Sequence, residues 1–225
     1  MDKKIPQCIG IILDGNRRWA KARSLSSFEG HKEGADRLRD AVYWVKARGV
    51  KHLVVYAFST ENWNRSEEEV SHMMNLAHAL VEKMFSKISE DNICIKFVGE
   101  RGRFDKRMQE DMRRVEEESK SNDAFTVWVC ISYGGRAEIV EAARAVAVEG
   151  EITEESLAKN LWTNGMPDPD IIIRTGGEKR LSGFLPWQSV YSELFFIDNY
   201  WPDFSEAILD SVLREYAQRE RRMGK

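Results

Sequence analysis

Cysteine and proline are scarce in this chain, and long uninterrupted apolar runs are missing. Its 225 residues include three cysteines and five prolines. An odd cysteine count without Cys-x-x-Cys spacing argues against disulfides or a zinc site, so we expect Cys8, Cys94 and Cys130 to be buried thiols of a cytoplasmic protein. Every apolar stretch falls far short of the roughly 20 residues that span a membrane, and the N-terminus does not resemble a signal peptide.

An excess of positive charge is also missing. The 34 lysines and arginines are outnumbered by 37 acidic residues, which gives a formal net charge of −3. Proteins that bind nucleic acid normally present a net basic surface, so we expect no nucleic-acid partner. Because 42% of the residues are hydrophobic, the chain is long enough to bury a sizeable core, and we expect one domain over residues 1–225.

Short β-branched runs alternate with helical patterns along the chain. The predicted strands are CIGIIL, HLVVYAF, ICIKFVG, FTVWVCIS, DIIIR and ELFFI. The predicted helices cover residues 34–48, 67–89, 103–119, 136–148, 154–161 and 205–222. This alternation predicts an α/β fold with a mostly parallel central sheet flanked by helices on both faces. Ligands of such sheets bind at the carboxyl ends of the strands.

Polar clusters follow four of these strands. They read DGNRRWA, FSTENWNR, SYGGR and RTGGEKRLSGF. Glycine permits tight turns, and several arginines close together favour the binding of phosphate groups. The carboxylates of Asp14 and Glu193 would hold a hard cation such as Mg²⁺ on those phosphates. The pattern therefore predicts a phosphate pocket at the carboxyl edge of the sheet.

Each of these signals also has an ordinary structural interpretation. The glycine pairs match neither a dinucleotide fingerprint nor a phosphate-binding P-loop, so alone they mark only turns. His31 opens a predicted helix, where a capping role and a ligand role are equally plausible, and Trp19 and Trp63 could be core aromatics. An apolar stripe along residues 70–88 is core by its periodicity alone.

Motifs spread along the whole chain resemble those of one family. In order they are DGNRRWA, GHKEG, YAFSTENWNR, SYGGR, RTGGEKRLSGFLPWQ, ELFF and WPDF, and together they resemble the cis-prenyltransferases, also called isoprenyl transferases or undecaprenyl diphosphate synthases. The resemblance implies a homodimeric enzyme that adds isopentenyl diphosphate units to an allylic diphosphate, typically farnesyl diphosphate, with cis double bonds and Mg²⁺. It also implies an apolar tunnel with the 70–88 stripe as one wall, a medium-chain product such as undecaprenyl diphosphate, and transient membrane-surface contact during product release.

The same resemblance implies roles for individual residues. Asp14 resembles the catalytic aspartate that holds Mg²⁺, Glu193 the second metal ligand, and Asn62 the residue that accepts or relays a proton. The positions that resemble substrate contacts are Gly15, Asn16, Arg17, Arg18, Trp19, His31, Ser59, Thr60, Glu61, Trp63, Arg65, Leu181, Arg174, Arg180 and Ser182, the last three resembling the isopentenyl diphosphate site. Arg222 and Gly224 resemble an element that completes the neighbouring subunit's site.

Two other functions fit parts of the pattern. An apolar strand ending in Asp-Gly also begins the aspartate-nucleophile phosphohydrolases, but these need a second aspartate two residues on, where this chain has Asn16. A non-catalytic partner subunit of the same fold is the other alternative. Retention of Asp14 and Asn62 argues against it.

One strand also bears on product length. Alternation along FTVWVCIS puts Phe125 and Val127 on one face and Trp128 and Cys130 on the other. Phe125 stands at the start of the strand, far from the predicted catalytic edge. It either closes the floor of the implied tunnel or fills the core.

Overall fold

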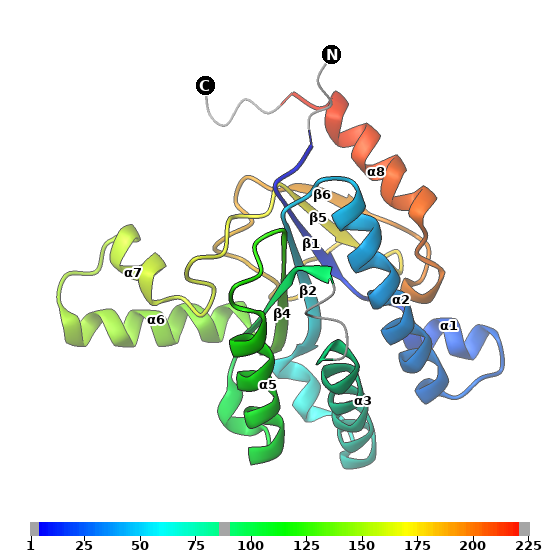
Figure 1. Ribbon diagram of the computed structural model, residues 1–225, viewed down its shortest axis with the longest axis horizontal. Helices are drawn as coiled ribbons and strands as arrows, with labels where there is room; N and C mark the ends of the chain where they lie inside the picture. Colours follow the sequence, from blue (N-terminus) through cyan, green and yellow to red (C-terminus); the bar gives the residue numbers. More distant parts are fainter. Residues whose placement is uncertain (1–4, 86–90, 221–225) are drawn as a thin grey trace.

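A computed structural model of the chain describes residues 5–85 and 91–220. All strands of these residues join one sheet (Figure 1). They are β1 (Cys8–Ile12), β2 (His52–Ser59), β3 (Ile93–Val98), β4 (Phe125–Tyr133), β5 (Ile171–Arg174) and β6 (Glu193–Phe196). The strand order is β3-β4-β2-β1-β5-β6, and every neighbouring pair is parallel. The six predicted strands and the parallel α/β fold are confirmed.

Seven α-helices lie in the described residues. They are α1 (Asn16–Ala22), α2 (Ser27–Ala47), α3 (Glu67–Phe85), α5 (Lys106–Ser119), α6 (Gly135–Glu149), α7 (Glu154–Asn160) and α8 (Glu206–Gln218). Six of them match predicted helices to within a few residues at most ends, whereas α1 was not predicted. The predicted ends of the third and last helices, residues 86–89 and 221–222, lie outside the described residues.

The start of α2 corrects the prediction for His31. The Ser26 hydroxyl accepts a hydrogen bond from the backbone N–H of Glu29, and the Glu29 carboxylate accepts one from the Ser26 N–H at 2.8 Å. This reciprocal capping box begins the helix at Ser27, about two turns before the predicted start. His31 therefore lies inside α2 and does not open it.

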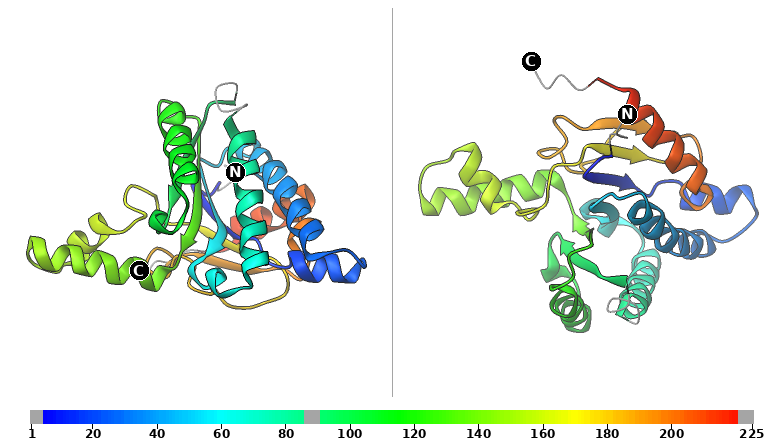
Figure 2. Two further views of the ribbon diagram at one scale, coloured as in Figure 1. Left: turned by 90° about the horizontal axis from the view of Figure 1, so that it is seen from below. Right: turned by 45° about the horizontal axis from the view of Figure 1, so that its top comes forward.

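The two faces of the sheet are covered differently. Helices α2, α3, α5 and α8 all pack on one face, where residues such as Val45, Met112 and Leu209 join a single apolar cluster. The other face carries a second cluster in which Trp128 and Phe184 meet, and the irregular chain around residues 162–166 and 181–185 covers it. Helices α6 and α7 project from the rest of the molecule as an arm (Figure 2). Helices flank the sheet, but the prediction of helices on both faces is only partly right. Turns cover most of this second face because the segments before and after β5 are rich in Gly and Pro.

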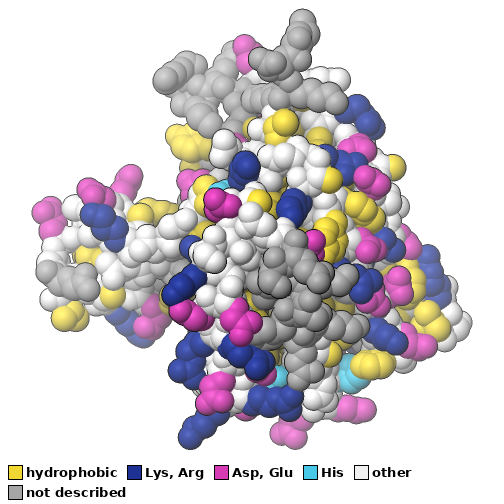
Figure 3. Space-filling view, viewed as in Figure 1, with side chains coloured by type: hydrophobic (Ala, Val, Ile, Leu, Met, Phe, Trp, Pro, Cys, Tyr) yellow, Lys and Arg dark blue, Asp and Glu magenta, His cyan; other side chains and the backbone are white. Residues whose placement is uncertain are grey.

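The order of the strands creates a crevice at one edge. Central β1 pairs with β2 on one side and with β5 on the other. The chain runs from β1 to β2, β3 and β4 on one side and then crosses over to add β5 and β6 on the other side, so the order of the strands reverses at β1. Ligands of open α/β sheets bind at such a switch point, outside the carboxyl ends of the strands. Over the face drawn in Figure 3, basic and acidic side chains are interspersed. Among the described residues, no helix is both long and apolar enough to cross a membrane.

Candidate active site

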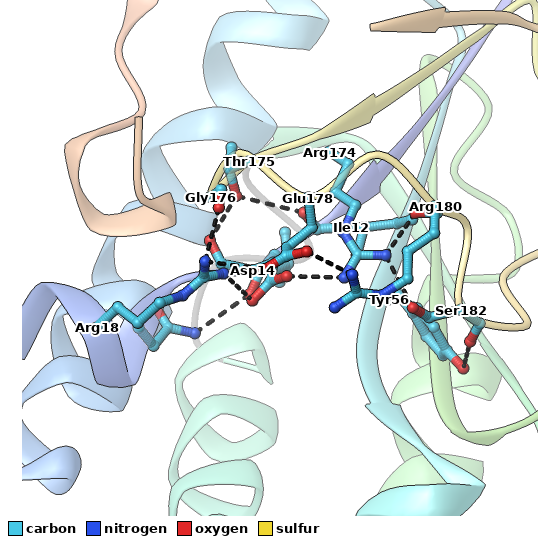
Figure 4. A network of polar contacts seen from close by, with 12 residues as sticks. Ile12, Asp14, Arg18, Tyr56, Arg174, Thr175, Gly176, Glu178, Arg180 and Ser182 are labelled. Atoms are coloured by element: carbon cyan, nitrogen blue, oxygen red, sulfur yellow. Dashed lines mark hydrogen bonds and ion pairs between the residues drawn. The ribbon is translucent and has the colours of Figure 1, made fainter. Parts of the chain in front are cut away.

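Asp14 lies in the crevice, two residues beyond the end of β1. Its Oδ1 accepts a hydrogen bond from Arg18 Nη2 at 3.1 Å, and its Oδ2 accepts one from Arg174 Nη2 at 2.8 Å (Figure 4). Arg18 comes from α1 and Arg174 from the end of β5. The carboxylate, 28% exposed, is thus fixed from both sides while one part still faces the crevice.

Two glycines allow this packing. Gly15 and Gly176 have φ values of +109° and +85°, in the left-handed region that favours glycine. A Cβ on Gly176 would lie 2.7 Å from Arg18 Nη2, whereas the glycine lets Arg18 Nη1 donate to the Gly176 carbonyl at 2.8 Å. The Thr175 hydroxyl then donates to the Asp14 carbonyl at 2.7 Å. The turns after β1 and β5 are therefore locked to each other.

Arg174 is the most buried cation of the site. Its side chain is 5% exposed, and Nη1 donates to Ser182 Oγ at 2.8 Å and to the carbonyl of Arg180. Its Nε is buried and has no hydrogen-bond partner among the residues that the structure describes. A buried donor without a partner costs free energy unless a ligand or water satisfies it.

Glu178 is a member of this network that the sequence did not single out. Its carboxylate lies 3.3 Å from Arg18 Nη1 and also pairs with Arg180, which is 60% exposed. It thus occupies the position of an anion between two arginines. Its place in the RTGGEKR motif, four residues after Arg174, was the available signal.

The cluster after β2 lies on the opposite side of the crevice. A 3₁₀ turn, Thr60–Asn64, follows the strand, and Asn62 Oδ1 accepts a hydrogen bond from the Ser59 N–H at 3.1 Å. The Thr60 hydroxyl donates to Glu61 Oε2 at 3.2 Å. The amide oxygen of Asn62 is therefore occupied by the turn itself.

Two polar cavities contain most of the predicted site residues. A cavity of about 910 Å³ has in its lining Asp14, Asn16, His31, Ser59, Thr60, Glu61, Asn62, Arg65, Arg174, Arg180 and Ser182. A second, of about 680 Å³, is lined by Gly15, Arg17 and Arg18 and again by Asp14, Asn16, His31 and Arg65. The structure therefore brings together residues from strand ends that are far apart in the sequence, and Asp14 faces both cavities.

Three predicted substrate contacts line neither cavity. Trp19 Nε1 donates to Asp203 Oδ1 at 2.8 Å, and Trp63 Nε1 donates to Ser132 Oγ at 2.9 Å. Leu181 packs against the second apolar cluster.

Glu193 is not brought next to Asp14 within one chain. It begins β6, pairs in register with Ile171 and accepts a hydrogen bond from Arg219 Nη1 at 2.7 Å. Arg174, by contrast, pairs with the last residue of β1, two residues before Asp14. Glu193 is therefore about five residues further back along the strand direction, on the order of 16 Å at about 3.3 Å per residue. These two carboxylates of one chain do not share a metal ion.

The donor set around Asp14 nevertheless suits magnesium. The described residues contain no group of three or more His, Cys, Asp or Glu side chains that could cage a metal ion. Magnesium commonly keeps several waters and is held by one or two carboxylates together with substrate phosphates. The partly exposed Asp14 carboxylate, at the boundary of both cavities, supplies one such ligand. Arg222 and Gly224 lie outside the described residues.

His31 faces the cationic part of the site. Burial lowers the pKa of its imidazole below 6.5, and the nearby Arg65 guanidinium lowers it further. The negative charge of Glu69 partly compensates, because it raises the pKa of His31. Glu69 also pairs with Arg65 at 3.0 Å and with Arg17 at 3.3 Å. Glu69 is four residues after Arg65, the helical spacing of an ion pair, and this signal was overlooked.

An apolar cavity of about 350 Å³ adjoins the polar one between α2 and α3. Its lining includes Phe28, Val42, Ala79, Ile93, Ile95 and Val127. Ala35, Leu38, Leu76 and Leu80 line both this cavity and the 910 Å³ cavity. Phe125 is 1% exposed and belongs to the main core cluster, and it does not line the cavity. The predicted alternation of the strand is confirmed, but Val127 and not Phe125 faces the apolar space.

A parallel α/β sheet whose strand ends gather several arginines and the carboxylates of Asp14 and Glu178, beside an apolar cavity, is typical of proteins that bind phosphate esters with an apolar part. Comparison with known sequences narrows this class. Residues 12–224 match the family described as putative undecaprenyl diphosphate synthase, and the chain belongs to this family. It is 46% identical to an isoprenyl transferase of Fusobacterium nucleatum, over 100% of this chain and 98% of that one. It is 44% identical to an isoprenyl transferase of Neisseria gonorrhoeae, over 98% and 90%.

Solved structures agree with this assignment. The lavandulyl diphosphate synthase of Lavandula x intermedia, solved with dimethylallyl diphosphate, superposes with a TM-score of 0.92 at 32% identity, over 100% of both chains. A probable undecaprenyl diphosphate synthase from Campylobacter jejuni superposes with a TM-score of 0.84 at 29% identity, over 98% of this chain and 99% of that one. The predicted family and the prediction of an enzyme, a prenyltransferase of isoprenoid biosynthesis, are confirmed.

Proposed function

We propose that this enzyme catalyses the Mg²⁺-dependent, successive cis-condensation of isopentenyl diphosphate with an allylic diphosphate, with farnesyl diphosphate as the primer. The observation that carries the proposal is the position of Asp14. Its carboxylate is held between Arg18 and Arg174 where the two polar cavities meet, and one of these adjoins the apolar cavity. A diphosphate and a hydrocarbon chain can therefore be bound at the same time.

The arginines form two groups that suit two diphosphates. Arg17 and Arg18 line the 680 Å³ cavity and suit the allylic diphosphate, whereas Arg174, Arg180 and Ser182 line the 910 Å³ cavity and suit isopentenyl diphosphate. Guanidinium groups bind phosphate oxygens through paired, charge-assisted hydrogen bonds. Two substrates fixed side by side react as if within one molecule, which removes much of the entropic part of the barrier.

The reaction requires the allylic C–O bond to break while the isopentenyl double bond attacks the allylic carbon. Arg17 and Arg18 stabilise the negative charge that grows on the leaving diphosphate more strongly in the transition state than in the bound substrate. Magnesium bound by Asp14 would add Lewis-acid stabilisation of that same charge. The isopentenyl carbon loses a proton as the new double bond forms. Asn62, on the opposite wall, relays this proton, and the released diphosphate accepts it.

The apolar cavity suits the growing hydrocarbon chain as a tunnel. Its walls come from α2, α3 and the sheet, and they are mostly aliphatic or aromatic. Apolar surface buried in this way favours binding of the prenyl chain by roughly 25 cal/mol per Å². The proposed product has medium length, as in undecaprenyl diphosphate, and would serve as a lipid carrier for the cell wall.

The proposal also includes a homodimer of single-domain subunits in the cytoplasm, with transient membrane-surface contact. Strand β6 is at the edge of the sheet, and Val190, Tyr191 and Leu194 beside it are 72%, 63% and 37% exposed. Large exposed apolar side chains along an open sheet edge favour association with another chain. A second copy placed here would lie close to Glu193. Sedimentation of the purified chain tests the dimer, and a monomer at micromolar concentration would contradict it.

A transfer assay tests the reaction. The purified chain is incubated with farnesyl diphosphate, radiolabelled isopentenyl diphosphate and Mg²⁺, and the products are extracted into butanol. We expect label in the organic phase that requires both substrates and is lost with a chelator. Release of inorganic phosphate without labelled lipid would instead indicate a phosphohydrolase, and neither product would indicate a non-catalytic subunit.

A further inference from the structure

Arg136 is a cation of the 910 Å³ cavity to which the proposed function gives no role. It is the second residue of α6 and is exposed in the lining of that cavity. Within residues 5–85 and 91–220, its guanidinium makes no hydrogen bond or ion pair. The other arginines of this lining all have carboxylate partners: Arg65 pairs with Glu69, Arg174 with Asp14, and Arg180 with Glu178.

The backbone places Arg136 beside the proposed isopentenyl diphosphate site. The Gly135 N–H donates to the Gly183 carbonyl at 2.9 Å, which joins the start of α6 to the loop that carries Ser182. A Cβ on Gly135 would lie 2.0 Å from Cδ of Pro186, so glycine is required for this close approach. The glycine pair in SYGGR thus fixes the next residue, Arg136, at the same wall as Ser182.

The amino end of α6 adds donors at the same place. Its N-cap, Gly134, has no side chain to bond the first turn. The Gly135 and Glu138 N–H groups have backbone partners, but those of Arg136 and Ala137, which both line the cavity, have no hydrogen-bond partner among the described residues. The first-turn N–H groups and the helix dipole attract anions.

A separate observation also indicates a ligand on this side of the cavity. Arg174 is 5% exposed, lines the same cavity and has a buried Nε with no partner in the described part of the chain. Arg174 and Arg180 are each already paired with a carboxylate, Asp14 and Glu178 respectively, and Arg18 shares both of these carboxylates. An arriving diphosphate therefore finds an unbalanced cation at Arg136, which breaks no existing ion pair when it turns toward the ligand.

We propose that Arg136, with the free N–H groups at the start of α6, binds the diphosphate of the isopentenyl substrate as a third wall beside Arg174 and Arg180. This inference rests on the proposed function for the identity of the substrate. Arg136 is assigned to the isopentenyl site and not to the allylic one because it lines the 910 Å³ cavity and is absent from the lining of the 680 Å³ cavity.

The test compares Arg136→Ala and Arg136→Lys with Arg144→Ala. Arg144 is a matched control because it lies about two turns further along α6, is 73% exposed and pairs with Glu141 outside the site. Steady-state kinetics give the KM of each substrate, and calorimetric titration with isopentenyl diphosphate alone gives a Kd without turnover. We expect Arg136→Ala to raise both the KM and the Kd for isopentenyl diphosphate at least tenfold, with the KM for farnesyl diphosphate within twofold of wild type. We expect the KM and Kd of Arg136→Lys for isopentenyl diphosphate to lie between those of wild type and Arg136→Ala.

Other results would overturn the inference. It fails if Arg136→Ala matches Arg144→Ala in KM and Kd for isopentenyl diphosphate, or if only the KM for farnesyl diphosphate changes. If the wild-type chain transfers no prenyl group, the proposed function fails, and the titration still decides the role of Arg136. A Kd that is tenfold higher in Arg136→Ala would then still support a diphosphate site at Arg136, and an unchanged Kd would contradict it. Because Arg136 is exposed, melting temperatures near wild type are expected throughout.

Discussion

Arg174 Nη2 lies 2.8 Å from Asp14 Oδ2, and this hydrogen bond joins the most buried cation of the site to its central carboxylate. The guanidinium is held at its other end by Ser182 Oγ at 2.8 Å. Neither group can turn without leaving a charge unpaired in a poorly solvated place. The carboxylate is therefore preorganised before any substrate binds.

Substitution of this carboxylate tests the centre of the proposal. Asp14→Asn keeps the size of the side chain and one acceptor oxygen but removes the charge that would hold magnesium. We expect kcat to fall by about 10³-fold, which corresponds to ~4 kcal/mol in the activation barrier, with little change in secondary structure. Circular dichroism and the butanol-extraction assay measure both effects. A variant that keeps more than about a tenth of the wild-type rate would show that Asp14 has no such role.

Arg174 and Arg180 differ in burial, and this difference predicts that their substitutions have different effects on stability. Arg180 is 60% exposed, so Arg180→Ala should raise the KM for isopentenyl diphosphate without a change in melting temperature. Arg174→Ala removes charged hydrogen bonds from a buried place, and we expect the same rise in KM together with a loss of about 1.5–3 kcal/mol in the free energy of unfolding.

Urea unfolding and two-substrate kinetics on both variants check this prediction. Equal stability of the two proteins would show that the Asp14–Arg174 contact contributes nothing to the fold. If only the KM for farnesyl diphosphate rose, Arg174 and Arg180 would belong to the allylic site, and the assignment of the two substrate sites would be reversed.

The pKa of His31 predicts a pH dependence of stability. Burial and Arg65 lower this pKa in the folded chain, while the unfolded value is about 6.5. As pH falls below about 6.5, the unfolded chain takes up the proton before the folded chain does, so His31 increasingly favours unfolding. This loss of stability stops growing below the folded pKa, where both states carry the proton. We expect His31→Gln to become more stable relative to wild type as pH falls from 7 to 5. Urea unfolding of both proteins over this range measures the difference, which isolates His31 from the other histidines. A difference independent of pH would contradict the prediction.

Val127 and Phe125 offer a test of product length. Val127 lines the apolar cavity, so Val127→Phe should fill part of it and shift the products to shorter chains, with little change in the rate of the first condensation. Phe125 is core, so Phe125→Ala should cost roughly 3–5 kcal/mol of stability and leave chain length unchanged. Thin-layer separation of dephosphorylated products, together with thermal melts, checks both variants. Longer products from Phe125→Ala at wild-type stability would make Phe125 the floor of the tunnel after all.

Local sequence patterns were enough to predict the strands of the sheet and to bring together most residues of the candidate site. Each strand is a short β-branched run, and parallel pairing gathers whatever follows those strands at one edge. The convergence of Asp14, Asn62 and Arg174 could therefore be predicted without any information on side-chain contacts. Glu193 does not follow this pattern, because it begins its strand and so lies toward the opposite edge in its own chain. Its role as a metal ligand stays a prediction.

Contacts between segments decided the rest. Alternation along β4 assigns Phe125 and Val127 to one face, but only the packing of α2 and α3 decides which of them meets a cavity, because a period of two carries no information on depth. The positions of Glu178 between two arginines and of Arg136 beside Ser182 depend on close approaches at Gly176 and Gly135. The sequence by itself determined which chemical groups stand at the ends of the strands. Tertiary structure decided which charges neutralise one another and which remain free to bind, because ion pairs form between residues that only folding brings within about 4 Å.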